Sequence, residues 1–320
     1  MPVLKKRDVN GNARSLAPAE ELWAGGAVAA PGSEPVQSPG VPGWLPVCGN
    51  ERCRTSWLKL WRRRLTPRFE GAWACSPRCL EEMLRAAMAR EAPTQTEEMA
   101  PGEAHQHRVP LGLMLYSQGV ITQEQLRTAL DAQRQAAEHG QPARRIGRWL
   151  IQQQSLTEVQ LARALSAQWN CPLYSAERLE VKQAAPLLPR LLVESCGVLP
   201  LRRTGSGRLL VAYEDRLDHC VNLALERMHR RPVEAGVMPS SEFRSARAEL
   251  IQARFPKLRL IEVANRSVMV RAMVRRIEDF QPLDAALVRI HEYFWLRMWR
   301  TIDRHPESAE DLLAVESDFR

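Results

Sequence analysis

Four of the seven cysteines in this 320-residue chain fall into two close pairs. Four residues separate Cys48 from Cys53, three separate Cys75 from Cys79, and 21 residues lie between the pairs. Two short loops that each supply two thiolates can complete the tetrahedral coordination of a zinc ion. A segment of under about 50 residues needs such a ligand, because it cannot bury a sufficient core alone. We therefore expect a structural zinc site; the alternative is four unconnected thiols.

The second cysteine pair lies in the sequence WACSPRCLEEML, which predicts a helix that starts after Ser76. Cys79 would then lie in the first turn, where the helix dipole favours a thiolate. The other cysteines, Cys171, Cys196 and Cys220, are isolated, and we expect them to be small core residues.

A basic run extends from Arg52, just before Cys53, to Arg68 and contains no acidic residue. Its charged members are Arg52, Arg54, Lys59, Arg62, Arg63, Arg64 and Arg68. Trp57 and Trp61 are interleaved with them, and such a surface could bind phosphates and stack on bases. We expect the tryptophans to fill the zinc core. The arginines leave the choice open between a solvated face and a surface that binds nucleic acid, anionic lipid or an acidic protein. The net charge of +8 is concentrated here, because the rest of the chain holds 38 basic and 37 acidic residues.

Residues 110–133 and 145–168 form an internal repeat of 24 residues. The copies read PLGLMLYSQGVITQEQLRTALDAQ and RIGRWLIQQQSLTEVQLARALSAQ. In each copy a threonine stands three residues before a glutamine, which is the spacing of a capping box at a helix start. Leucine and alanine follow at helical spacing. Each copy therefore predicts two helices joined by a turn, and the two copies together predict a small bundle.

The chain divides by composition into segments of different character, and we expect an α+β multidomain protein. Its start is rich in Ala, Gly, Pro and Ser and predicts disorder. The expected order is a disordered segment 1–44, a zinc module of zinc-ribbon or treble-clef-like type 45–90, a linker 91–104, the helical repeats 105–170, an α/β unit 171–254, a βαββ-like unit 255–305 and an acidic tail 306–320.

Two interpretations remain open for residues 282–304. The residues around His291 and Glu292 are rich in β-branched and aromatic types, which favours a hairpin. The alternative is one amphipathic helix over the whole segment. From Pro306 onward the chain is acidic, and we expect it to be mobile.

The repeats and the α/β unit behind them, residues 109–251, resemble the amino-terminal domain of bacterial type II secretion and type IV pilus assembly ATPases. The most specific parts are RIG at residues 145–147, the two QLxxALxxQ stretches, and LLVAYEDRLD at residues 209–218. The resemblance implies a domain that docks a motor to inner-membrane partners. It also implies binding of cyclic di-GMP, which some members bind through two tandem motif copies whose arginine stacks on guanine.

The motif positions carried over to this chain come from both copies. They are Leu111, Gly112, Gln125, Leu126 and Gln133 in the first copy, and Arg145, Ile146, Gly147, Gln160, Leu161 and Gln168 in the second. The chain departs from the motif where Pro110 replaces the first arginine, Gln154 replaces a glycine, and Arg216 replaces a proline. A spacer of eleven residues, 134–144, is also longer than in nucleotide-binding members. The alternative is that these positions only pack the bundle.

No GxxxxGK[ST] loop and no Gly-Lys dipeptide occurs, so the ATPase half of that family is missing. No apolar run approaches the roughly 18 residues of a membrane helix, and no secretory signal is recognisable. We therefore expect a cytoplasmic, non-enzymatic adaptor or regulatory protein that contacts a secretion or pilus component and responds to cyclic di-GMP. The alternative is a zinc-dependent nucleic-acid-binding regulator that acts through the basic run.

Overall fold

The computed structural model describes residues 47–54, 67–91, 109–142, 144–177, 179–301 and 303–317, all within one unit, Pro46–Arg320. The predictions for residues 1–44 and for nearly all of the linker therefore lie outside the described residues. Within them the chain is α+β, with helices and three small sheets. None of the helices seen there is long and apolar enough to cross a membrane.

The cysteine-bearing segment forms a short hairpin followed by a helix. Its elements are β1 (Arg68–Phe69), β2 (Ala72–Trp73) and α1 (Pro77–Arg90). Ser76 caps α1, because its hydroxyl accepts a hydrogen bond from the Cys79 amide at 3.3 Å, and Pro77 occupies the first turn. The predicted helix start is confirmed.

The repeats form two helix pairs, as their periodicity predicts. The helices are α2 (Leu111–Ser117) and α3 (Gln123–Glu138) in the first copy, and α4 (Ile146–Gln152) and α5 (Glu158–Trp169) in the second. Both predicted capping boxes are present: Thr122 exchanges hydrogen bonds with Gln125, and Thr157 with Gln160.

The turn inside each repeat needs a left-handed residue at the same position. Gly119 occupies it in the first copy with a φ of 68°, and Gln154 occupies it in the second with a φ of 57°. Glycine adopts this conformation freely, whereas a residue with a Cβ is strained there. The preference of the motif for glycine at this position is therefore explained by the positive φ that the turn requires.

The following unit places helices around a three-stranded sheet of order β3-β4-β5. Its elements are η3 (Val181–Leu187), α6 (Arg190–Ser195), β3 (Val198–Arg203), β4 (Leu209–Tyr213), α7 (His219–His229), β5 (Val233–Val237) and α8 (Ser240–Ile251). Strands β3 and β4 form the predicted hairpin, while α7 connects β4 to its parallel neighbour β5. Cys171 and Cys196 are half-buried here, and Cys220 is exposed, so the prediction of a core position is wrong for Cys220.

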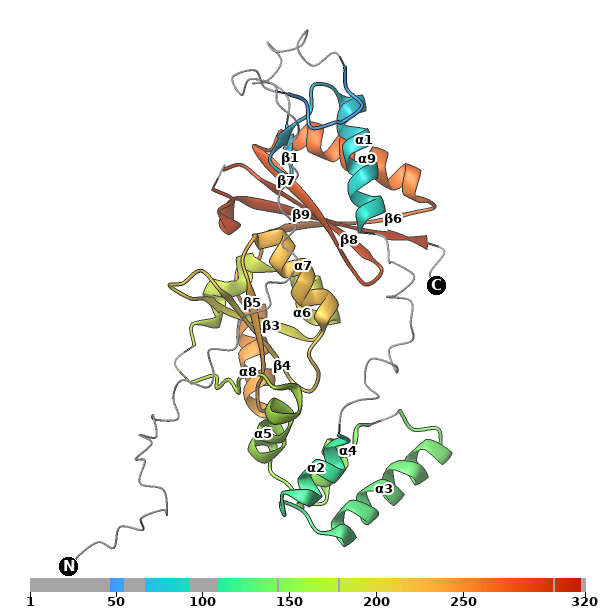
Figure 1. The fold of residues 1–320 in the computed structure, drawn as a ribbon, viewed down its shortest axis with the longest axis vertical. Coiled ribbons are helices and arrows are strands. Elements are labelled where there is room, and N and C mark those ends of the chain that lie inside the picture. Colours follow the sequence, from blue (N-terminus) through green and yellow to red (C-terminus); the bar gives the residue numbers. More distant parts are fainter. Residues whose placement is uncertain are drawn as a thin grey trace, which may run out of the picture. The chain divides into compact units, whose positions relative to one another are not determined.

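Residues 257–316 form a four-stranded sheet of order β6-β9-β8-β7 with one helix between its first two strands along the chain. Its elements are β6 (Lys257–Val263), α9 (Arg266–Phe280), β7 (Asp284–Ile290), β8 (Tyr293–Trp299), η4 (Pro306–Ser308) and β9 (Ala309–Glu316). Helices α1 and α9 lie on the same face of this sheet and share its apolar core (Figure 1). Strands β7 and β8 pair antiparallel, which confirms the hairpin and excludes the single helix.

The prediction of an acidic tail from residue 306 is wrong. Strand β9 lies inside the sheet, parallel to β6 and antiparallel to β8. Its acidic residues have partners: Asp311 pairs with Arg297, and Glu310 with Arg276. Because these charges are compensated by distant residues, the segment is buried despite its composition, and the βαββ-like unit extends to β9.

Candidate functional site

A cavity of about 620 Å³ opens between the helices of the two repeats and the loop that follows β4. Nine of the eleven positions carried over from the motif line it. They are Leu111, Gly112, Leu126 and Gln133 from the first copy, and Arg145, Ile146, Gly147, Leu161 and Gln168 from the second. The fold therefore brings these positions together from both copies into one groove.

The two remaining positions, Gln125 and Gln160, do not line the groove. Their side chains accept hydrogen bonds from the amides of Thr122 and Thr157, at 2.8 and 2.9 Å. These glutamines cap the starts of α3 and α5. Their place in the motif is therefore explained by helix capping.

The motif glycines let the two helices of each repeat approach closely. A Cβ at Gly112 would lie 2.6 Å from Cδ1 of Leu126, and one at Gly147 would lie 2.7 Å from Cδ1 of Leu161. Both distances are far below van der Waals contact. These glycines and leucines thus line the groove and also form the packing contact between the two helices of each repeat.

The last residue of each copy holds the start of the other copy. Gln133 Nε2 donates a hydrogen bond to the Arg144 carbonyl at 2.6 Å, and Gln168 Nε2 donates one to the Val109 carbonyl at 2.8 Å. Val109 and Arg144 each directly precede the first residue of a copy. The two bonds are equivalent under exchange of the repeats, so the groove is built with approximate two-fold symmetry.

The charged residues that line the groove are Arg145, Arg148, Asp215 and Arg216. Arg148 of α4 pairs with Glu214 and lies 3.9 Å from Asp215, both in the loop after β4. Burial raises the pKa of Asp215, and the nearby Arg148 offsets part of this effect. Arg145 and Arg216 are exposed, line the groove, and form no ion pair with any residue that the structure describes.

Eight residues that line the groove are not among the eleven motif positions, and three of them are Trp169, Arg148 and Asp215. Trp169 ends α5, and its ring lies 6.4 Å from that of His219 between centroids. Arg148 and Asp215 line the groove as well. Trp169 directly follows the last motif glutamine, and Asp215 lies within the LLVAYEDRLD stretch. Both residues could therefore have been found from the sequence motifs beside or around them.

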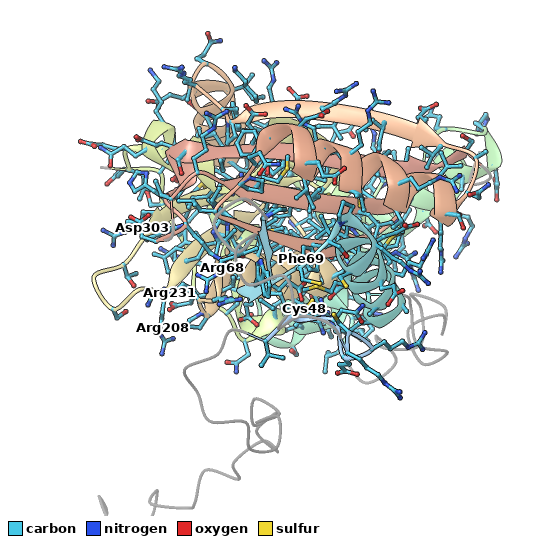
Figure 2. All side chains as sticks on the ribbon, turned by 90° about the horizontal axis from the view of Figure 1, so that it is seen from above. Cys48, Arg68, Phe69, Arg208, Arg231 and Asp303 are labelled. Carbon is cyan, nitrogen blue, oxygen red and sulfur yellow. The ribbon has the colours of Figure 1, made fainter. Side chains whose placement is uncertain are left out.

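The four predicted cysteine ligands lie together. Their sulfur atoms are all within 4.8 Å of one another, and Cys75 Sγ lies 3.5 Å from both Cys53 Sγ and Cys79 Sγ. Zinc with Zn–S bonds of about 2.3 Å requires sulfur separations of about 3.8 Å. Sulfur atoms gather beside Cys48 in Figure 2. The donor set and its spacing therefore fit a tetrahedral metal ion.

Backbone contacts position these sulfur atoms. Gly49 donates a hydrogen bond to the Trp73 carbonyl at 2.8 Å, and the Cys75 amide donates to Cys48 Sγ at 3.4 Å. Burial raises the pKa of Cys75 to about 12. Burial also acts to raise the pKa of Cys79, but hydrogen bonds, first from Ser76, outweigh it and lower that pKa to about 7. The thiol of Cys79 is thus more readily ionised than that of Cys75.

The basic run is only partly described. Arg52, Arg54 and Arg68 are exposed, whereas Lys59, Arg62, Arg63 and Arg64 lie outside the described residues.

Comparisons with known proteins find relatives for part of the chain. No family model and no curated protein matches it. The solved structure of MshE with cdg is 28% identical, with 45% of this chain and 99% of that chain covered and a TM-score of 0.37. The N-terminal domain of XpsE is 17% identical, with 46% and 94% covered and a TM-score of 0.32. The similarity is thus limited to a little under half of this chain, whereas nearly all of each solved chain is covered.

Proposed function

We propose that residues 109–251 form a cyclic-dinucleotide-binding domain of a non-enzymatic regulatory adaptor. The ligand is cyclic di-GMP, and the protein partner is a component of a secretion or pilus machine. The observation that carries the proposal is the convergence of nine motif positions from both repeats on one cavity. A volume of about 620 Å³ is in the range of small-molecule sites.

The chemistry of the groove suits this ligand class. A cyclic dinucleotide has two purines, two phosphates and an approximate two-fold axis, and the reciprocal Gln133 and Gln168 bonds give the groove the same symmetry. Leu111 and Ile146 offer equivalent apolar contacts from the two copies. The exposed guanidinium of Arg145 can stack on a purine or bind a phosphate.

A regulatory role agrees with the chemistry of the lining. The groove side chains that titrate are arginines and Asp215, which lies beside Arg148, and no nucleophile is paired with a base among them. The sequence also lacks a phosphate-binding loop of the ATPase type. Ligand binding would therefore change partner contacts rather than start a reaction.

Isothermal titration of the full chain with cyclic di-GMP tests the proposal. We expect saturable binding that Arg145→Ala weakens. Arg163→Ala is the matched control, because Arg163 is an exposed arginine on α5 outside the groove lining. Absence of binding heat at tens of micromolar protein would overturn the proposal.

We also infer that Cys48, Cys53, Cys75 and Cys79 hold one structural zinc ion in a treble-clef-like module. When bound, the ion would tie the loop at residues 47–54 to the start of α1, which packs on α9. Metal analysis of the purified protein should find about one zinc per chain, and Cys75→Ser should abolish it. Full zinc content in that variant would contradict the assignment.

A second candidate function is nucleic-acid binding through the basic run. It is favoured by Arg52, Arg54 and Arg68, which are exposed and unpaired within the described ranges. Charge reversal at Arg62, Arg63 and Arg64 should then weaken DNA or RNA binding and flatten its salt dependence. Cyclic di-GMP binding should be unchanged, so the two functions are separable.

A further inference from the structure

Arg216 lies in the loop that follows β4 and lines the groove. In the repeat alignment, the first copy has Pro110 where the second copy has Arg145. The first position of the two copies therefore supplies the groove with one arginine, Arg145, instead of two. A second cation reaches it from outside the repeats.

The backbone on both sides of Arg216 is fixed. Before it, Glu214 pairs with Arg148 of α4. After it, Leu217 is buried with 7% exposure, and Asp218 caps α7 by accepting a hydrogen bond from the Val221 amide at 3.1 Å. The guanidinium of Arg216 itself is exposed. The loop thus presents an available cation at a defined place beside the groove.

The charged residues that line the groove are three arginines and one carboxylate, Asp215. Arg148 is engaged by carboxylates, because it pairs with Glu214 and lies 3.9 Å from Asp215. Arg145 and Arg216 remain, and neither forms an ion pair within the part of the chain that the structure describes. A cyclic dinucleotide carries two phosphate charges, so two free guanidinium groups match it, whereas Arg145 alone does not.

We propose that Arg216 is the second guanidinium that contacts the ligand and replaces the arginine missing at Pro110. The ligand is then held between the helical repeats and the α/β unit, and its two halves have different cationic partners. This inference rests on the proposed function of the groove. It adds a binding residue and a ligand contact from the α/β unit that the repeat motif does not contain.

The equivalent backbone positions of the two copies provide a rescue variant. Pro110 has φ −55° and ψ 137°, and Arg145 has φ −70° and ψ 151°. Both precede the first helix of their copy, and neither side chain caps that helix. An arginine can therefore replace Pro110 without backbone strain.

The test is titration of the full chain with cyclic di-GMP, using wild type, Arg216→Ala, Arg163→Ala and the double variant Pro110→Arg/Arg216→Ala. We expect Arg216→Ala to bind about tenfold more weakly. Arg163→Ala should bind as wild type, and the double variant should recover most of the loss. Thermal melting of each variant confirms that the proteins are folded.

The outcomes separate this inference from the proposed function. If wild type binds and Arg216→Ala binds equally well, the inference is overturned and the function stands. If Arg216→Ala and Arg163→Ala weaken binding equally, the effect is general charge and the inference is again overturned. If wild type does not bind, the proposed function is overturned and the inference with it.

Discussion

Arg297 on β8 and Asp311 on β9 form an ion pair whose side chains are both 0% exposed. Arg297 Nε donates to Asp311 Oδ1 at 2.7 Å, and Nη2 donates to Oδ2 at 2.8 Å. Trp295 Nε1 donates to Oδ1 as well, at 2.7 Å. The remaining Nη1 donates to the Leu187 carbonyl at 2.9 Å, at the end of η3. The pair thus joins two strands and connects their sheet to the α/β unit.

Asp311→Asn should destabilise the protein by about 3–5 kcal/mol, because it leaves the buried Arg297 charge without its counterion. Urea unfolding measures the change. The double variant Asp311→Leu/Arg297→Met should be less destabilised, since it removes both charges. A loss below about 1 kcal/mol in the single variant would contradict this role.

His229 should make stability fall on mild acidification. Burial, followed by the nearby charges of Arg297 and Arg203, lowers its pKa to about 3, and its Nε2 lies 2.8 Å from the Leu187 carbonyl. Below about pH 6.5 the unfolded state binds a proton that the folded state excludes. Stability is therefore complete above that pH, and it should decrease by about 1.4 kcal/mol per pH unit between pH 6 and 4.

The His229→Gln variant provides the comparison for this pH dependence. Its amide can still donate to the Leu187 carbonyl but does not titrate. Denaturant unfolding between pH 7 and 4 should show a shallower slope in the variant. Equal slopes in both proteins would mean that His229 is not the responsible group.

Gln154→Gly should stabilise the protein by about 1 kcal/mol. The φ of Gln154 is 57°, which costs a residue with a Cβ about 1–2 kcal/mol. The reverse change at the equivalent position, Gly119→Ala, should destabilise it by a similar amount, although no atom lies within 4 Å of the added Cβ. Unfolding midpoints measure both, and a Gln154→Gly protein no more stable than wild type would contradict the strain.

Gly147→Ala should cost about 1–3 kcal/mol of stability, because the added Cβ would lie 2.7 Å from Leu161 Cδ1. The displaced Leu161 side chain would move within the groove and weaken ligand binding. In a Leu161→Ala background the same change should cost less, since the clash is gone. Identical costs in both backgrounds would show that these side chains do not interact.

The repeats, their capping boxes and the β7–β8 hairpin were predictable because their signals are local. Thr122 and Gln125, for example, are three residues apart and form the cap without help from the rest of the fold. Strand β9 was not predictable, because Asp311 is tolerated in the core only through Arg297 on β8.

The candidate site shows the same division. The motif positions lie on helices that local periodicity defines. Asp215 and Arg216 reach the groove only because the loop after β4 is placed there by the sheet and by Arg148.

The hydrogen bond from Gln133 to the Arg144 carbonyl fixes the end of the spacer 134–144, so the length of the spacer does not change the position of the second repeat. Residues 134–138 continue α3, and residues 139–142 are exposed beyond it. This bond holds Arg144 directly before the groove residue Arg145, so residues inserted between 139 and 142 would not displace the second repeat. Residues 139–142 are therefore a position for inserting a fluorescent reporter, which would report ligand binding in the groove without lining it.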